Sequence, residues 1–323
     1  MTIKIGLIGT GSFASKHGDL LAAMEDVRVV AVSGTSVGKA EALASRYPGA
    51  AAYGSVTDML NGGSLDAAYV CVPPFAHGEA ELALAAAGIP FFVEKPLGVD
   101  LETPSRVLEE VRARRLITSV GYHFRYMDSA ARARELLAGQ TAGMAIGRWL
   151  GGMPGVYWWR RQEGSGGQLM EQTTHLVDLL RYLMGEVTEV YAAYAQRVMH
   201  EQHEGVTVPD VGALTLKMAS GAVASLTNTC MSPHAGSVGL QVYASEGMLE
   251  LDHQGLTHVS QDRKTLYKNI TDPYALENRI FIDAVRTGDP EAIRSSYGDA
   301  WRTQQVTAAA NRSALIEQPV RII

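Results

Sequence analysis

The chain has 323 residues, of which 46% are hydrophobic and 19% are charged, and its formal net charge is −6. This ordinary globular composition excludes disordered, collagen-like and fibrous classes, and the length allows two domains. The negative charge argues against a general nucleic-acid binder, which needs clustered lysine and arginine, and no run of about 18 apolar residues predicts a membrane span.

From Ile3 to about Gly121, short apolar runs alternate with longer amphipathic segments. This alternation predicts parallel strands joined by helices, and the apolar runs indicate a sheet covered on both faces. We therefore expect an α/β fold with an N-terminal Rossmann domain, a doubly wound parallel sheet, at residues 1–122. The predicted strands are 3–9, 27–33, 67–72, 89–94 and 116–122, and the predicted helices are 15–24, 38–47, 77–88 and 104–115.

After Tyr122 the pattern changes, and we assign residues 123–323 to a second domain for substrate binding and oligomerisation. A helix, a strand and a long helix from about Leu169 to Met184 come first. Residues 187–251 then show mostly alternating polarity, which predicts a large, mostly antiparallel open sheet with helices on one side, an α+β domain. Two further helices are predicted at 274–286 and 298–316.

The cellular location is predicted from the start of the chain and from its cysteines. "MTIKIGLIG" leads directly into an apolar strand, so we expect no export signal. Cys71 and Cys230 lie in apolar strand patterns, and buried free thiols in a reducing cytoplasm are the simplest interpretation.

The segment "IGLIGTGSFA" carries the first chemical motif, with Gly9, Gly11 and Ala14 in a G-x-G-x-x-G/A pattern between a strand and a helix. Gly9 permits a tight turn, Gly11 allows the backbone to approach a pyrophosphate, and Ala14 allows close helix packing. The helix N-terminus offers N–H donors to phosphates. The residues expected to contact the dinucleotide here are Gly9, Thr10, Gly11, Ser12, Phe13 and Ala14.

The tip of the second strand, "VVAVSGTSVGK", lacks the acidic residue that binds the ribose 2′-hydroxyl of NAD. Gly34 occupies its place, followed by Thr35 and Ser36, with Lys39 one helical turn later. Hydroxyls, helix N–H groups and an ammonium could hold a 2′-phosphate, so we predict NADP, with NAD as the alternative.

Two further segments, "VCVPPFAH" and "FFVEKPLG", follow predicted parallel strands. Ligands of open α/β sheets bind at the carboxyl ends of the strands, so Lys95 is expected beside a nicotinamide. A solvated strand end is the alternative for these charged residues.

The chain resembles the glucose–fructose oxidoreductase / inositol dehydrogenase family of NAD(P)-dependent sugar and polyol oxidoreductases. The matching motifs keep the family's order and spacing across nearly the whole chain. They are "GTGSFA", Pro73 and His77 in P-x-x-x-H, "EKP" at residues 94–96, and "GGQLMEQTTHLVDLLRYLMG" at residues 166–185.

The resemblance implies that Lys95 lies near the reacting carbon, where an ammonium favours a developing alkoxide. It also implies that Glu94 orients the site and that Pro96 fixes the backbone, with a cis bond as one way to do so. Pro73 and His77 would line the cofactor cleft. For His77 the alternative is a histidine at a helix start that bonds to the backbone.

In the second domain, Glu171, His175 and Asp178 are spaced to share one stripe of a largely buried helix. Buried polar groups in a row are costly unless they are paired or functional, so a satisfied structural network is the alternative. The resemblance implies that His175 is the general base on the substrate hydroxyl. Glu171 stands where the family usually has aspartate, and Thr173 where it usually has glycine.

Two further segments supply candidates for substrate binding, one at the domain junction and one in an aromatic loop of the second domain. His123 in "GYHFRY" corresponds to a polar substrate-facing residue of the family. "YWWRR" offers aromatic faces and guanidinium donors through Tyr157, Trp158 and Arg160, and a subunit interface is the alternative role for it. "HEQHE" at residues 200–204 lacks the H-E-x-x-H spacing and is expected between strands rather than on a helix, so no metal site is predicted.

We therefore expect a cytoplasmic enzyme that transfers a hydride between a secondary alcohol of a sugar, polyol or derivative and NAD(P). A homodimer or homotetramer through the open sheet is expected, with no nucleic-acid or membrane partner. Two alternatives remain open: a hydrolase or lyase that uses NAD as a transient oxidant on the same fold, and a non-catalytic NAD(P)-sensing regulator.

Overall fold

The computed structural model describes residues 2–233 and 236–322. The chain forms two compact units. The N-terminal unit comprises residues 1–98, 102–122 and 274–301, and the C-terminal unit comprises 99–101, 123–273 and 302–323. The chain passes from one unit to the other at both ends of residues 99–101, after Tyr122, and at both ends of residues 274–301.

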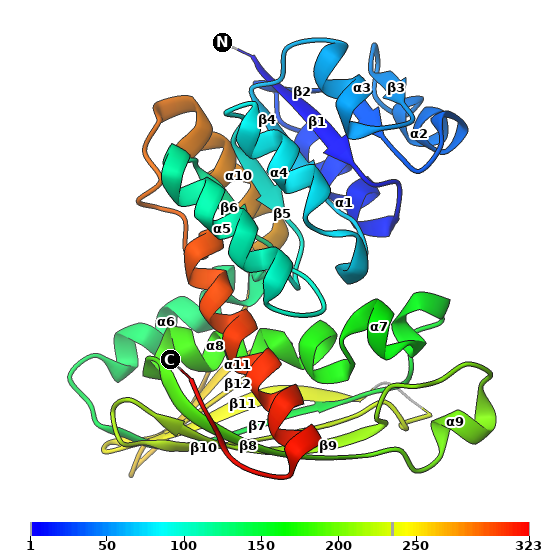
Figure 1. Cartoon of the computed structure of the whole chain (residues 1–323). Helices are drawn as coiled ribbons and strands as arrows, with labels where there is room; N and C mark the ends of the chain where they lie inside the picture. Colours follow the sequence, from blue (N-terminus) through cyan, green and yellow to red (C-terminus); the bar gives the residue numbers. More distant parts are fainter. Residues whose placement is uncertain (1, 234–235, 323) are drawn as a thin grey trace. The chain divides into compact units, whose positions relative to one another are not determined.

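The N-terminal unit contains a six-stranded parallel sheet in the order β3-β2-β1-β4-β5-β6. This order confirms the doubly wound Rossmann-like sheet (Figure 1). Strand β3 and helix α3 were not predicted, because so few residues cannot show a periodic pattern. The strands are β1 (Ile3–Ile8), β2 (Val27–Ser33), β3 (Ala51–Tyr53), β4 (Ala67–Val70), β5 (Phe91–Val93) and β6 (Thr118–Val120).

Helices cover both faces of this sheet, as the continuous apolar strands require. One apolar core joins the sheet to α1, α2 and α10, and the other joins it to α3, α4, α5 and the first turn of α11. Helix α10 belongs here because Phe281 and Ile282 pack into the same core as Ile5 and Phe92. The bounds are α1 (Ser12–Ala22), α2 (Val37–Ala44), α3 (Val56–Asn61), α4 (Glu79–Ala86), α5 (Glu102–Arg114) and α10 (Pro273–Thr287), with the 3₁₀ turn η1 (Pro74–Ala76).

The C-terminal unit contains a nine-stranded sheet in the order β14-β13-β12-β11-β7-β10-β9-β8-β15. Among the described residues, its neighbouring strands pair antiparallel except β7 and β10, which confirms the mostly antiparallel sheet. The strands are β7 (Ala142–Leu150), β8 (Val187–Ala195), β9 (Val211–Met218), β10 (Val223–Thr229), β11 (Ser237–Ala244), β12 (Gly247–Asp252), β13 (Gly255–Val259), β14 (Lys264–Lys268) and β15 (Val320–Arg321).

Helices α6 (Asp128–Leu137), α8 (Thr174–Met184) and α11 (Tyr297–Ile316) lie on one face of this sheet (Figure 1). The apolar sides of these helices pack with the strands into one core, which includes Ala133 of α6, Leu180 of α8 and Val306 of α11. The shorter helical segments of this unit are η2 (His123–Tyr126), η3 (Tyr157–Arg160), α7 (Gln162–Ser165), the π-helical η4 (Leu169–Thr173) and α9 (Met199–Gln202).

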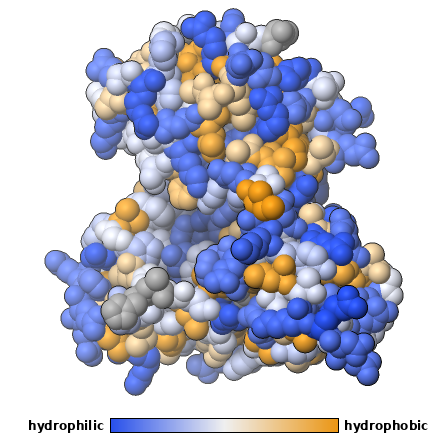
Figure 2. Space-filling model, turned by 180° about the vertical axis from the view of Figure 1, so that it is seen from behind, coloured by the Kyte–Doolittle hydropathy of each residue, from blue (hydrophilic) through white to orange (hydrophobic). Residues whose placement is uncertain are grey.

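The opposite face of the sheet exposes apolar side chains, among them Met144, Ile146, Tyr191, Val223 and Tyr243. In Figure 2 the lower edge of the molecule, where this sheet lies, shows apolar atoms among hydrophilic ones. No helix in the described part of the chain has the length and apolar character needed to span a membrane.

One prediction about local structure was wrong. The run "HEQHE" does lie between strands β8 and β9, but its first three residues are on a helix, since they form the end of the four-residue α9. Within residues 2–233 and 236–322, no group of three His, Cys, Asp or Glu side chains could hold a metal ion.

Candidate functional site

In the turn between β1 and α1, the backbone conformation at position 9 suits only glycine. Its φ is +106°, and a Cβ there would lie 2.2 Å from the carbonyl oxygen of Cys71. Gly11, the N-cap of α1, is different: apart from its chain neighbours, no described heavy atom lies within 4 Å of a Cβ built on it. Ala14 is buried against the sheet. The turn therefore leaves open space in front of the N–H groups of α1, which fits a dinucleotide phosphate.

An open pocket of about 590 Å³ lies beside this turn. Exposed Lys39 reaches it from α2, and its ammonium donates to the Thr35 hydroxyl at 3.3 Å. Ser36 caps α2 by accepting the Lys39 N–H at 3.4 Å. A Cβ on Gly34 would lie 2.8 Å from the Thr10 methyl group, so this tip has no room for a carboxylate without a shift. The pocket is lined by Thr10, Gly11, Ser12, Ser15, Lys39, Ala42, Leu43 and Arg46.

Arg46 brings a second cation to the same pocket, and the sequence interpretation missed it. Its guanidinium donates to the Asp19 carboxylate at 2.7 Å and to the Ser15 hydroxyl. It follows Lys39 by seven residues within the helix that the sequence predicts at 38–47, and this spacing is the signal that could have found it, although α2 ends at Ala44. Phe13, near the start of α1, is exposed, and its ring centroid lies 6.4 Å from that of Tyr274.

The Glu94-Lys95-Pro96 segment follows β5 directly, and the bond between Lys95 and Pro96 is cis. Lys95 is half-buried, and its backbone N–H donates to the Glu94 carboxylate at 3.2 Å. Glu94 is buried, and its other oxygen lies 2.8 Å from Nε2 of His17, a residue that the sequence interpretation did not select.

Pro73 and His77 flank η1 at the end of β4. His77 is buried, and its Nδ1 lies 2.5 Å from the Glu81 carboxylate, whose other oxygen accepts the Gly78 N–H at 2.7 Å. Its Nε2 is buried without a hydrogen-bond partner in the part of the chain that the structure describes. The observed bond of His77 is thus to a side chain at the start of α4, rather than to the backbone.

In the C-terminal unit, Glu171 lies on the π-helical turn η4 just before α8. Gly166 and Gly167, with φ of +74° and +90°, lead the chain into this turn. The indole Nε1 of Trp159 donates to the Glu171 carboxylate at 2.8 Å. A π-helical turn is rare and often occurs at functional sites.

Trp159 is a third residue that the sequence interpretation missed, after Arg46 and His17, although it lies between the selected Trp158 and Arg160. It is buried, whereas Tyr157 is 61% exposed and Trp158 and Arg160 are half-buried. Composition alone could not separate the two neighbouring tryptophans, because their roles depend on which ring faces η4.

His175 is buried on α8 within an aromatic cluster. Its ring stacks on Phe124 and Trp149, with centroids 4.9 and 5.9 Å away, and meets the His123 ring edge-on at 4.8 Å. The C-terminal unit therefore brings together His123 and His175, which are 52 positions apart in the sequence.

Asp178, on the same stripe of α8, belongs to a structural network. Its two oxygens accept hydrogen bonds from Arg125 at 2.7 Å each, and the Thr303 hydroxyl donates to it at 2.9 Å. Arg181 donates to Thr303 and to Glu186. Because a buried carboxylate needs such partners, this network ties α8 to η2 and α11.

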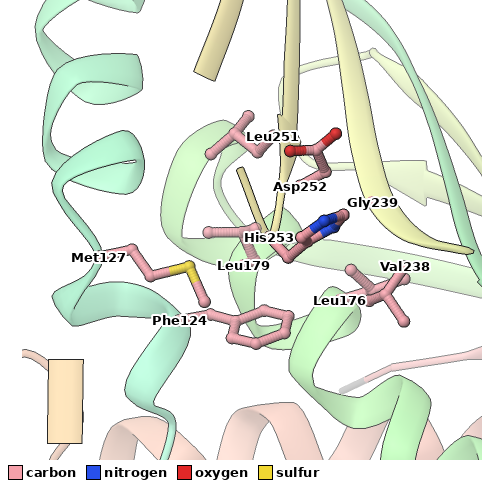
Figure 3. Close-up of a pocket in the computed structure, with 9 residues that line it drawn as sticks. All are labelled: Phe124, Met127, Leu176, Leu179, Val238, Gly239, Leu251, Asp252 and His253. Carbon is pink, nitrogen blue, oxygen red and sulfur yellow. The ribbon is translucent and has the colours of Figure 1, made fainter. Parts of the chain in front are cut away.

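A small apolar cavity of about 80 Å³ lies beside the His175 cluster (Figure 3). Phe124 contributes to both, since its ring stacks on His175 and lines the cavity. The lining residues are Phe124, Met127, Leu176, Leu179, Val238, Gly239, Leu251, Asp252 and His253.

Both cysteines are buried and free, as the sequence predicts. Burial, together with the negative charges of Glu94 and Glu277, raises the pKa of the Cys71 thiol well above its usual range. Burial raises the pKa of Cys230 to about 11. Neither thiol is therefore a thiolate nucleophile near neutral pH.

The predicted site residues thus fall into two groups, each within one unit. The glycine-rich turn, Lys39, His77 and Lys95 belong to the N-terminal unit, and His123, Glu171 and His175 belong to the C-terminal unit. The convergence of Lys95 and His175 on one nicotinamide stays a prediction.

Residues 3–122 match the family described as "Oxidoreductase family, NAD-binding Rossmann fold", and residues 132–250 match the "GFO/IDH/MocA C-terminal domain". The chain is 25% identical to the myo-inositol 2-dehydrogenase of Thermotoga maritima, over 92% of each chain. It is also 25% identical to the inositol 2-dehydrogenase of Rhizobium meliloti, over the full length of both. A levoglucosan dehydrogenase, solved in complex with NADH, has the same fold, with a TM-score of 0.90 at 19% identity over 100% of both chains.

Alanine substitutions at the two glycines of the turn are expected to have different effects. Gly9→Ala should lower the free energy of unfolding by about 1–3 kcal/mol or more, because Cβ meets the Cys71 carbonyl at a strained φ. Gly11→Ala should leave the unfolding midpoint nearly unchanged, yet weaken dinucleotide binding about tenfold or more. Denaturant unfolding and cofactor titration measure the two effects. Unaltered cofactor affinity in Gly11→Ala would contradict the placement of the phosphates here.

Proposed function

Because the chain belongs to the GFO/IDH/MocA family of NAD-binding oxidoreductases, we propose that it transfers a hydride between a secondary alcohol of a sugar, polyol or derivative and a nicotinamide cofactor. One observation supports this most directly. The glycine-rich turn and the Lys95 segment follow β1 and β5 of one parallel sheet, with only β4 between them. The proposed phosphate site and the half-buried Lys95 therefore both lie at the carboxyl ends of these parallel strands.

The proposed domains are residues 1–122 for the dinucleotide and residues 123–323 for substrate and oligomerisation. Helix α10 supports the first domain from the C-terminal part of the sequence. The relatives named inositol 2-dehydrogenase support a cyclic polyol or a related sugar as substrate.

The proton of the substrate hydroxyl is assigned to Lys95 and His175. An ammonium stabilises a developing alkoxide, and a neutral imidazole accepts a proton near neutral pH. Bound nicotinamide supplies the hydride chemistry. Glu171, held by Trp159, and His123 are assigned to hydrogen bonds with substrate hydroxyls. Tyr157, Trp158 and Arg160 are the proposed outer contacts, and Pro73, His77 and Glu94 are assigned to the cofactor side.

Lys95→Ala should lower kcat by about 10²- to 10⁴-fold, because the alkoxide loses its positive partner, while cofactor still binds. Steady-state rates with a panel of inositols, sugars and sugar acids, together with cofactor titration, measure both quantities. Lys264→Ala, an exposed lysine on β14, is the matched control and should behave as the wild type.

Near-normal turnover of Lys95→Ala would refute the catalytic assignment. Substrate consumption without net formation of reduced cofactor would instead indicate that the cofactor acts as a transient oxidant.

We assign NADP as the preferred cofactor, with NAD as the alternative, on the charges of the pocket beside Gly11. Lys39 and Arg46 both line it, and the β2 tip at Gly34 carries no carboxylate to repel a 2′-phosphate. Each cation would form a charge-assisted hydrogen bond with that phosphate. Ser36 and Thr35 add a hydroxyl each at the start of α2.

Lys39→Ala should reduce kcat/KM for NADP by about tenfold or more and leave that for NAD within about twofold, since only NADP carries the phosphate. Arg46→Ala should act in the same direction. Arg114→Ala, at the end of α5, is the control for loss of a surface charge. A markedly higher kcat/KM of the wild type with NAD would overturn the NADP assignment.

The open face of the C-terminal sheet is the proposed surface for a homodimer or homotetramer, because it presents apolar side chains from neighbouring strands. A cytoplasmic location is proposed from the two free, buried cysteines. No nucleic-acid or membrane partner is proposed for a chain with net charge −6.

Ile146→Lys, in the middle of that face on β7, should shift the assembly to a smaller species, because it places a charge in the proposed interface. Leu315→Lys on α11, which is 75% exposed, is the control and should leave the assembly intact. Light scattering after size-exclusion chromatography measures the mass, and a monomeric wild type would contradict the proposal.

A further inference from the structure

A buried polar cluster lies behind the Lys95 segment in the N-terminal unit. It consists of His17 on α1, Glu94 after β5, and Asn278 on α10, which are 0%, 5% and 0% exposed. The Glu94 and Asn278 side chains come from distant parts of the sequence, yet both contact the His17 ring.

The His17 imidazole is fixed at both nitrogens and on its sides. Nε2 lies 2.8 Å from the Glu94 carboxylate, and Nδ1 lies 3.0 Å from the Asn278 side-chain oxygen. The rings of Phe92 and Tyr69 pack against it with centroids at 4.9 and 5.5 Å. The ring therefore cannot turn without breaking a buried hydrogen bond.

The Glu94 carboxylate is held just as closely. One oxygen accepts from His17 Nε2, and the other accepts the backbone N–H of Lys95 at 3.2 Å. Gly121 limits the space around the Glu94 carboxylate on another side, because a Cβ at this position would lie 2.8 Å from it. Position 121 must therefore stay free of a side chain for Glu94 to keep this place.

Burial makes the His17 contact indispensable to Glu94. A buried carboxylate is costly unless hydrogen-bond donors compensate it, and the donors to Glu94 that the structure records are His17 and the Lys95 N–H. Without His17, the hydrogen bond that the carboxylate would retain within the described part of the chain is the one from the backbone N–H of Lys95, the residue that it is to position.

We propose that His17 is a positioning residue that holds Glu94 and, through it, the backbone of Lys95. This inference rests on the proposed catalytic role of Lys95. His17 also lies on the helix whose first N–H groups face the proposed phosphate site, six residues after Gly11. One helix thus serves cofactor binding at its N-terminus and the orientation of the reacting ammonium through its buried face.

Two amide variants separate positioning from simple core packing. In His17→Gln the side-chain nitrogen can reach the place of Nε2 and donate to Glu94. In His17→Asn it reaches only the place of Nδ1, toward Asn278. Both variants are neutral and polar, so they differ chiefly in the bond to Glu94.

His17→Gln should keep kcat within about threefold of the wild type. His17→Asn should lose about 10- to 100-fold in kcat with little change in KM, while its cofactor Kd stays within about threefold, which is the split expected when an interaction acts on the transition state. Equal kcat values for the two variants would overturn the proposal.

Two measurements keep the test decisive if either variant folds poorly. Gly121→Ala crowds Glu94 from the opposite side and should give the same selective loss of kcat. In the cofactor-free protein, the rate at which an amine reagent modifies Lys95, followed by mass spectrometry, should change in His17→Asn and Gly121→Ala but not in His17→Gln. An unchanged labelling rate in both perturbed variants would refute positioning.

Lys95→Ala in parallel distinguishes failure of this inference from failure of the proposed function. If Lys95→Ala is fully active, the catalytic assignment of Lys95 fails, whatever His17 does. If Lys95→Ala is inactive and His17→Asn is fully active, only the inference about His17 fails.

Discussion

The parallel pairing of β1, β4 and β5 is the constraint on which the candidate site of the N-terminal unit depends. Parallel strands end at the same edge of a sheet, so the segments that follow them become neighbours without any sequence proximity. The glycine-rich turn, the Pro73 to His77 segment and the Lys95 segment all arise from this edge. Each segment is chemically ordinary by itself, and they form a candidate site because they lie at the same edge of the sheet.

Buried polar groups then fix the side chains at that edge. Glu94 bonds to His17, and His77 bonds to Glu81, in surroundings from which water is largely removed. In such surroundings a polar group without a partner is costly, so each pair allows few alternative arrangements. Glycines complete the fit where a side chain would collide, as at Gly9 beside the Cys71 carbonyl and at Gly121 beside Glu94.

The C-terminal unit reaches its arrangement by a different route. Its long helix does not begin as an ordinary α-helix, because Gly166 and Gly167 lead into a π-helical turn that presents Glu171. The Trp159 indole fixes that carboxylate, and the aromatic rings around His175 fix the imidazole. Asp178, one turn further, accepts hydrogen bonds from Arg125 and Thr303 in a buried network. Residues on one helical stripe thus have different surroundings: an indole beside Glu171, aromatic rings around His175 and a guanidinium against Asp178.

The sequence by itself determined the alternation of strands and helices, the glycine turn, the Glu94-Lys95-Pro96 segment and the largely buried helix that carries His175, because these are local patterns set by backbone geometry and side-chain periodicity. Only the tertiary structure decided the partners. His17 and Asn278 are 261 positions apart, and α10 joins the first core through Phe281 although any amphipathic helix would show the same pattern. Trp159 likewise meets Glu171 only in the folded chain, and a single sequence carries no signal for the distance between residues that only folding brings together.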